Sequence, residues 1–227
     1  MSLTIYEDLE QGSSEWIAAR AGIVTASVVG KLLTAQGKVA NNDSSRTLTQ
    51  ALAAERITGR VEYSHPSRDM QRGTLLEPFA RDIYAEHHGP VDEVGFMRRD
   101  EPTWTLGFSP DGLIGDHGLL EIKSRTPRIQ INTIRAGSVP AANMAQLQAG
   151  LLVSGREWIA YVSYSPGLPL YTQRVYPIPT WQNAITQACE EYETVANEIV
   201  TDYEDLARRM VPTEYFDPFE QEDEEIT

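Results

Sequence analysis

The residues best suited to chemistry lie in two short segments near the middle of the chain. Asp111 stands in a Ser-Pro-Asp-Gly run, and Glu121, Ile122 and Lys123 follow it. Side chains alternate across a strand, so Glu121 and Lys123 are expected on one face, with Ile122 in the core. A turn would fold Asp111 back beside Glu121. Two carboxylates, with the Ile122 carbonyl between them, offer the hard oxygen ligands that Mg²⁺ prefers.

Lys123 supplies the remaining part of such a site, because a lysine can hold or deprotonate a water and neutralise developing negative charge. Metal, water and cation together are what metal-assisted phosphodiester hydrolysis requires. An ordinary hairpin with a surface Glu/Lys pair would show the same E-x-K spacing. The chain has only three lysines, which favours a role for this one. On these two segments alone, both interpretations stay open.

Further carboxylates could join this site. Glu77 lies on a predicted helix and shares a face with Arg81 and Tyr84, at i+4 and i+7. Glu77 is therefore either a third carboxylate at the metal or half of an exposed ion pair, which contributes little stability. Asp100 and Glu101, just before a predicted strand, are either a fourth carboxylate or part of an acidic loop.

A second kind of site is suggested near the N-terminus. Thr25, Ala26 and Ser27 are expected to open a helix, and Arg20 stands a few residues upstream. The free N–H groups and the dipole at a helix start favour an anion, and the arginine could bind the same anion. The alternative is that Thr25 is a helix N-cap and Arg20 a solvated charge.

The elements that must position these residues alternate along the chain, which predicts a single α/β domain with helices packed on a mixed sheet. Apolar spacing, capping residues and turn residues set the expected boundaries. Helices are expected at residues 13–22, 44–57, 74–87, 141–153 and 180–210, and strands at residues 104–108, 119–123, 157–164 and 170–176.

Composition limits the class of protein. The 227 residues carry a net charge of −14 and one cysteine, Cys189, which excludes an intramolecular disulfide framework and a multi-cysteine metal site. An acidic chain is a poor nonspecific DNA coat, but 16 of its 19 basic residues are arginines, which suit phosphate contacts in a local cleft. Neither a secretory signal nor a membrane span is evident, so a cytoplasmic protein with no membrane partner is expected.

We expect one domain over residues 1–212, followed by an acidic C-terminal tail at residues 213–227. The tail holds seven acids and no basic residue. A solvated tail is the simplest interpretation. Docking of a partner is an alternative, as is shielding of the outer surface.

Five blocks, taken in order over about residues 12–165, resemble the phage lambda exonuclease and YqaJ-like viral recombinase exonucleases of the PD-(D/E)xK superfamily. The blocks are Trp16-x-x-x-Arg20-x-Gly22-x-x-Thr25-Ala26-Ser27, Gly73-x-x-x-Glu77, Ser109-Pro110-Asp111-Gly112, Leu120-Glu121-Ile122-Lys123 and Ala145-Gln146-x-Gln148. The resemblance implies a restriction-endonuclease-like core, a mixed sheet flanked by helices, with a long C-terminal helix.

The resemblance also implies roles for individual residues. Mg²⁺, for which Mn²⁺ can substitute, would be bound by Asp111, Glu121 and the Ile122 carbonyl. The catalytic residues would be Glu77, Asp111, Glu121, Lys123 and Gln146. The terminal 5′-phosphate of DNA would be bound by Arg20, Thr25 and Ser27. For Gln146, a solvent-facing helix glutamine is the alternative.

The activity implied is a Mg²⁺-dependent 5′→3′ exonuclease. It would digest one strand of double-stranded DNA from a 5′-phosphorylated end and leave 3′ tails for a single-strand annealing protein. Relatives form homotrimeric rings around DNA, and a ring with arginines inside and acids outside would reconcile the acidic charge with DNA binding. The alternatives are an endonuclease of the same fold, either restriction or junction-resolving, and a non-catalytic ring that binds DNA ends.

Overall fold

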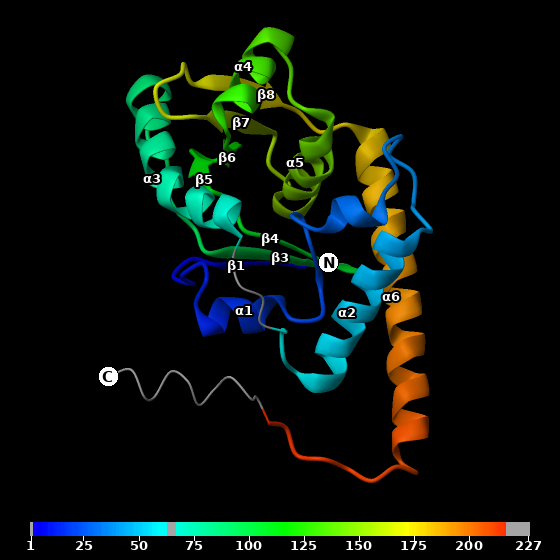
Figure 1. The fold of residues 1–227 in the computed structure, drawn as a ribbon. Coiled ribbons are helices and arrows are strands. Elements are labelled where there is room, and N and C mark those ends of the chain that lie inside the picture. The colour runs from blue at the N-terminus through cyan, green and yellow to red at the C-terminus, as the bar shows by residue number, and fades with distance from the viewer. Residues whose placement is uncertain (1, 63–66, 217–227) are drawn as a thin grey trace, which may run out of the picture.

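The computed structural model describes residues 2–62 and 67–216, and its strands form two four-stranded sheets with helices around them (Figure 1). The N-terminal elements are β1 (Ser2–Tyr6), α1 (Ser14–Arg20), β2 (Val24–Thr25), the 3₁₀ helix η1 (Val29–Leu32), α2 (Asp43–Thr58) and α3 (Arg68–His88). The remaining elements are β3 (Phe96–Asp100), β4 (Thr105–Phe108), β5 (Gly112–Ile114), β6 (Gly118–Ser124), α4 (Pro127–Ala136), α5 (Ala141–Ser154), β7 (Trp158–Tyr164), β8 (Tyr171–Val175) and α6 (Pro179–Ala207).

Both sheets mix parallel and antiparallel pairs, as the α/β prediction requires. The first has the order β1-β3-β4-β2, with only β2 and β4 parallel. The second has the order β5-β6-β7-β8, with only β6 and β7 parallel. Helix α5 contacts β4 of the first sheet and β7 of the second, so one helix joins the two sheets (Figure 1).

Local sequence explains where the predicted helices begin and end. The Ser13 side chain caps α1, and α2 begins with a capping box between Asn42 and Ser45. Helix α2 ends at Gly59, whose φ of 68° is a left-handed conformation that suits glycine. Helix α3 begins six residues earlier than predicted, because the Ser67 side chain accepts a hydrogen bond from the Met70 N–H and caps it there.

The predicted helix start at Thr25–Ser27 is wrong. Thr25 instead ends β2, which pairs with β4. The Ala26 N–H donates to the Gly107 carbonyl and the Val28 N–H to the Thr25 carbonyl, so these groups are not free to bind an anion. The following helix, η1, has only four residues and lacks a side-chain cap. Sheet pairing of the buried β-branched residues has overridden the local helix signal.

The hairpin that carries Asp111 also differs from the prediction. The predicted strand at 104–108 is β4 and belongs to the first sheet, whereas β6 belongs to the second. The partner arm of β6 is the short strand β5, with Gly112 opposite Leu120. A Cβ at Gly112 would lie 2.2 Å from Val91 Cγ1, so only glycine allows this close approach.

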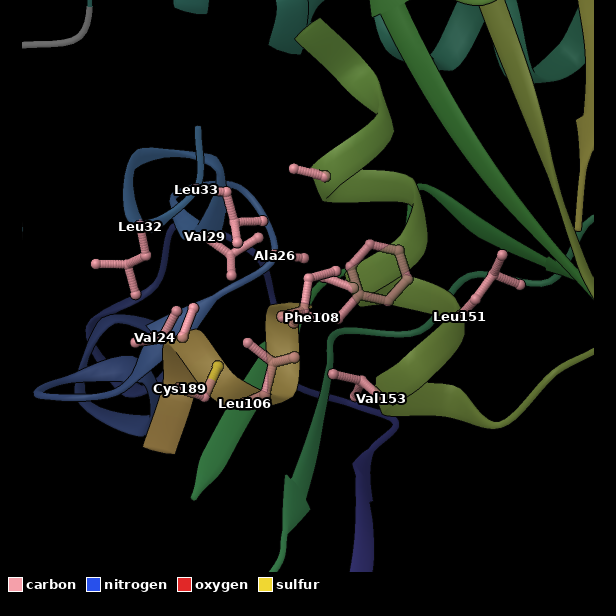
Figure 2. Packing of buried hydrophobic residues seen from close by; sticks show 14 of the residues in the cluster. Val24, Ala26, Val29, Leu32, Leu33, Leu106, Phe108, Leu151, Val153 and Cys189 are labelled. Carbon is pink, nitrogen blue, oxygen red and sulfur yellow. The ribbon is translucent and has the colours of Figure 1, made fainter. Parts of the chain in front are cut away.

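The larger hydrophobic core lies where β2, β4, α5 and α6 meet. Figure 2 shows Phe108 beside α5, with Val24, Leu106 and Cys189 packed nearby. A Cβ at Gly150 would lie 2.8 Å from the Phe108 ring, so a glycine lets α5 approach β4 closely. This close packing fixes α5 against β4, the strand that ends just before the Asp111 segment.

The second, smaller core cluster lies between α3 and the opposite face of β6 and β7. Ala80 and Tyr84 of α3 pack there against Leu120 and Ile122 of β6. No helix in the described ranges, 2–62 and 67–216, is long and apolar enough to cross a membrane. Described residues 213–216 of the predicted acidic tail are exposed and without regular structure, and residues 217–227 lie outside the described residues.

The single cysteine gives a test of this core. Cys189 is fully buried, and burial, with help from Glu193 and Glu190, raises its thiol pKa to about 12. The thiol therefore stays protonated and unreactive near neutral pH. We expect a thiol reagent to label native protein more than about a thousandfold more slowly than protein in guanidinium chloride, because a stability of about 5–15 kcal/mol makes opened forms rare. Equal rates would contradict the packing of α6 against the sheet.

Candidate active site

The short hairpin brings the two sequence motifs together. The Asp111 N–H donates to the Leu120 carbonyl at 3.1 Å, and Asp111 Oδ2 accepts from the Ile122 N–H at 2.5 Å. Asp111 is thereby held across from Glu121, as the sequence predicts. The Ile122 side chain packs on the α3 side of the sheet, so Glu121 and Lys123 lie on the other face of β6.

Glu121 is the centre of a polar cluster on that face. Its side chain is only 2% exposed. Its Oε1 atom lies 2.6 Å from Lys123 Nζ and accepts from Gln146 Nε2 at 2.5 Å. Its Oε2 atom is buried without a hydrogen-bond partner among the described residues. Gln146 therefore faces the site and is not the solvent-facing residue of the alternative interpretation.

Arg81 links Glu77 to the same hairpin. Its guanidinium forms an ion pair with Glu77 at 2.5 Å and with Glu93 at 2.7 Å, while its Nε donates to the Asp111 carbonyl at 2.8 Å. The Arg81 side chain is 13% exposed, so this is more than a surface ion pair. The i+4 spacing predicted the contact with Glu77. Nothing in the sequence indicated Glu93, which lies in the segment between α3 and β3.

The carboxylates in this region repel one another. Burial raises the pKa of the Asp111 carboxyl well above its ordinary value, and the negative charges of Glu121 and Glu77 raise it further. Burial also raises the pKa of Glu77, with Arg81 opposing the rise. Burial alone would lower the pKa of Lys123, but Glu121 and Asp111 raise it above its ordinary value. The cluster therefore carries more negative charge than its own cations neutralise.

These residues fit a hard divalent cation, although the described residues hold no ready-made group of three His, Cys, Asp or Glu ligands. Asp111 and Glu121 supply carboxylates, and the Ile122 carbonyl would complete the predicted set. The buried, unpartnered Glu121 Oε2 and the repulsion that raises the pKa of Asp111 both point to a missing positive charge. Bound Mg²⁺ would act as a Lewis acid on a phosphodiester.

The residues of the predicted phosphate pocket lie along one stretch of chain. Arg20 ends α1, and Thr25 Oγ1 lies 3.1 Å from Ser27 Oγ. The Arg20 guanidinium stacks 3.6 Å from the centroid of the Trp16 ring. Burial lowers the pKa of Arg20 to about 10, against the opposing effect of Glu55. Glu55 itself accepts a hydrogen bond from the Gly22 N–H at 2.8 Å.

The N-terminal region is tied directly to the Ser-Pro-Asp-Gly segment. The Trp16 indole Nε1 donates to Ser109 Oγ at 2.9 Å, and Gln11 Nε2 donates to the Pro110 carbonyl at 3.2 Å. The stacked ring of Trp16 thus connects Arg20 with the segment that carries Asp111. The sequence placed Trp16 in a block with Arg20, but it did not indicate a contact with Ser109.

Asp100 and Glu101 are not brought into the site. Asp100 pairs with Arg98 and Thr105, and Glu101 with Arg99, at the far end of the β3–β4 hairpin. Strand β4 then runs from Thr105 away from them before the Asp111 segment begins. The acidic-loop interpretation fits these contacts. An open hollow of about 630 Å³ between residues 37–41 and α6 also includes none of the site residues.

Known proteins share sequence and fold with this chain. The YqaJ-like viral recombinase domain matches residues 15–157. The crystal structure of an alkaline exonuclease (LHK-Exo) from Laribacter hongkongensis is 33% identical, with a TM-score of 0.77, over 88% of this chain and 100% of that chain. A structure of LHK-Exo in complex with dAMP matches equally well. No curated protein matches the chain.

A phage related exonuclease from Haemophilus somnus 129PT shares the fold at 14% identity and a TM-score of 0.53, over 78% of this chain and 96% of that chain. The fold is that of an α/β exonuclease, with two mixed sheets flanked by helices and a long C-terminal helix, and its E-x-K motif lies on the β5–β6 hairpin. The chain belongs to the YqaJ-like viral recombinase family.

The crowded carboxylates predict a measurable response to Mg²⁺. A carboxyl whose pKa is raised by folding destabilises the native state as pH rises through that raised value, so the metal-free protein should be more stable at mildly acidic than at alkaline pH. Mg²⁺ at about 100 times its Kd should add about 2.7 kcal/mol. Thermal unfolding of wild type at mildly acidic and at alkaline pH, each with and without Mg²⁺, measures both effects.

Two neutral variants and one control complete this test. Asp111→Asn should unfold at a higher temperature than wild type without Mg²⁺, because the pKa of Asp111 is raised by burial and by Glu121 and Glu77. Both Asp111→Asn and Glu121→Gln should lose the Mg²⁺ increment. Asp100→Asn removes a carboxylate whose pKa is lowered, despite burial, by Arg98 and Thr105. This control should therefore keep the full increment. An Mg²⁺ increment that survives in Asp111→Asn would place the cation elsewhere.

Proposed function

We propose that this chain is a Mg²⁺-dependent 5′→3′ exonuclease that digests one strand of double-stranded DNA from its 5′-phosphorylated end. The observation that carries the proposal is the assembly of Asp111, Glu121, Lys123 and Gln146 around one hairpin. Membership of the YqaJ-like family and the likeness to an alkaline exonuclease support it. A relative that binds dAMP is consistent with release of nucleotide products.

The protein's own groups would divide the work as follows. Lys123 would hold the attacking water and neutralise negative charge on the phosphate, because its ammonium group lies on the site face of β6. Gln146 and Lys123 fix one oxygen of Glu121, which leaves the buried Oε2 available as a ligand. Arg81 would position Glu77 and the Asp111 backbone by its three contacts.

Arg20 would determine the direction of digestion. It is partly buried, stacks on Trp16, and has no carboxylate within ion-pair distance among the described residues. Glu55 offsets this desolvation only in part, since burial still lowers the pKa of Arg20, so an external anion would supply the missing counter-charge. Thr25 and Ser27 would add hydroxyl donors to a terminal phosphate. Support for this pocket comes from the side chains, since the helix start expected there does not exist.

Recombination is the role that this activity would serve, by leaving 3′ tails for a single-strand annealing protein. A homotrimeric ring around DNA is part of the same proposal. Both rest on the family resemblance alone. A ring would retain DNA by enclosing it, so tight binding to a basic surface would not be needed. This is compatible with a chain whose net charge is −14.

The direct test is to follow both strands of an end-labelled linear duplex with Mg²⁺. Wild type should shorten one strand from its 5′ end and leave the other intact. Asp111→Ala, Glu121→Ala and Lys123→Ala should each lose nearly all hydrolysis. Lys38→Ala, which removes another of the three lysines, is the matched control and should be as active as wild type. If the protein instead nicks covalently closed circles, it is an endonuclease. If it binds DNA ends but releases no nucleotides with Mg²⁺, it is a non-catalytic ring.

Arg20 provides a second test, based on the end group. A charge-assisted contact is worth about 1.5–3 kcal/mol, so 5′-phosphorylated duplex should be digested at least about tenfold faster than 5′-hydroxyl duplex. Arg20→Ala should erase most of this preference by slowing the phosphorylated substrate. Arg20→Lys should restore only part, because a point charge replaces a two-pronged group. The initial digestion rates on the two substrates measure the preference for the 5′-phosphate. If Arg20→Ala keeps the wild-type preference, Arg20 does not bind the terminal phosphate.

A further inference from the structure

Arg125, like Arg20, is a partly buried cation that forms no ion pair within the described residues. Most of the other partly buried arginines form ion pairs, as Arg56 does with Glu193, Arg81 with Glu77 and Arg99 with Glu101. Arg156 forms none, but its guanidinium donates to the carbonyls of Gly115 and Gly118. Arg125 has no carboxylate within ion-pair distance in the described part of the chain, and its Nε is buried there without a partner. A guanidinium held out of water in this way lacks the anion that would offset its desolvation.

The side chain of Arg125 is nevertheless held in place. Its Nη2 donates to Asn143 Oδ1 at 2.8 Å and lies 3.4 Å from the hydroxyl of Tyr161. Its backbone N–H donates to the Tyr164 carbonyl at 2.7 Å, which extends the pairing of β6 with β7 by one residue. These contacts fix the orientation of the guanidinium, while its Nε has no partner among the described residues.

Its position places this cation beside the hydrolytic residues. Glu121 and Lys123 of β6 alternate with the core residue Ile122, and Arg125 directly follows the strand in the same alternation, so Arg125 shares the face of Glu121 and Lys123. Asn143 stands on α5 one turn before Gln146, which binds Glu121. Two residues of strand separate Lys123 from Arg125 by about 6.6 Å, so the two cations can contact different phosphates of one strand.

We propose that Arg125 binds a backbone phosphate of the DNA strand being cut, next to the phosphate at Lys123, and that Asn143 positions its guanidinium. This inference rests on the proposed nuclease function. The ligand is a phosphodiester of the nucleic acid backbone, and the contact carries no sequence information. Arg125 therefore differs from Arg20, whose proposed ligand is the terminal phosphate.

Salt dependence distinguishes a phosphate contact from a structural role. Each phosphate that a protein neutralises makes the plot of log affinity against log salt steeper by about 0.9 for duplex and about 0.7 for a single strand. The experiment titrates wild type and variants against a 5′-phosphorylated duplex oligonucleotide in EDTA, where a metal-dependent nuclease leaves DNA intact. Arg125→Gln should bind roughly tenfold more weakly at low salt and lose about one such increment of slope.

Three further variants complete the experiment. Arg128→Gln, on the exposed first turn of α4, is the matched control and should keep the wild-type slope and affinity. Arg125→Lys and Asn143→Ala keep the charge, so both should keep the slope while binding severalfold more weakly. If Arg125→Gln does not fold, as judged by circular dichroism, these two variants decide the outcome, and wild-type affinity in both overturns the proposal.

The two levels of the hypothesis fail differently. If folded Arg125→Gln keeps the wild-type salt slope, or if Arg128→Gln loses as much slope as Arg125→Gln, only the role of Arg125 is overturned. The proposed nuclease function then stands. Wild type that shows no salt-dependent binding to duplex DNA overturns the proposed function together with this contact.

Discussion

The carboxylate of Asp111 accepts a hydrogen bond from the Ile122 N–H, and this contact holds the two motifs of the site together. It exists because β5 pairs with β6 and because Gly112 lets β5 pass close to Val91. The same contact brings carboxylates together in a buried region, where they repel one another. Arg81, Lys123 and Gln146 contact the carboxylates or backbone of this site and partly compensate that repulsion, while Glu121 Oε2 has no partner among the described residues.

Much of the fold could be predicted from local signals, and the errors have identifiable causes. Helices α1, α2 and α5 and strands β6 to β8 lie within a few residues of their predicted bounds. Strand β3 was missed because three of its five residues are charged, and its Arg98 and Asp100 pair along one face. Helix α4 was missed although Pro127 at its first turn and Gly137 after its end are typical boundary signals.

The site could be predicted where the residues are close in sequence or fixed by strand alternation. Asp111, Glu121 and Lys123 are such residues, and Glu77 with Arg81 follows from helix spacing. Contacts between distant segments could not be derived in this way. Glu93 beside Arg81, Ser109 beside Trp16 and Asn143 beside Arg125 depend on how the two sheets and α5 pack. No local pattern encodes such packing.

Helix α5 carries two glutamines, Gln146 and Gln148, that make different contacts. Gln146 faces Glu121, while buried Gln148 accepts from the Ile178 N–H and donates to the Tyr176 carbonyl, where the chain enters α6. One inserted residue would rotate the following part of the helix by about 100°. Either the site or the connection to α6 would then lose its glutamine. The rotational phase of α5 is therefore constrained from both ends, so this helix should tolerate changes of side chain far better than changes of length.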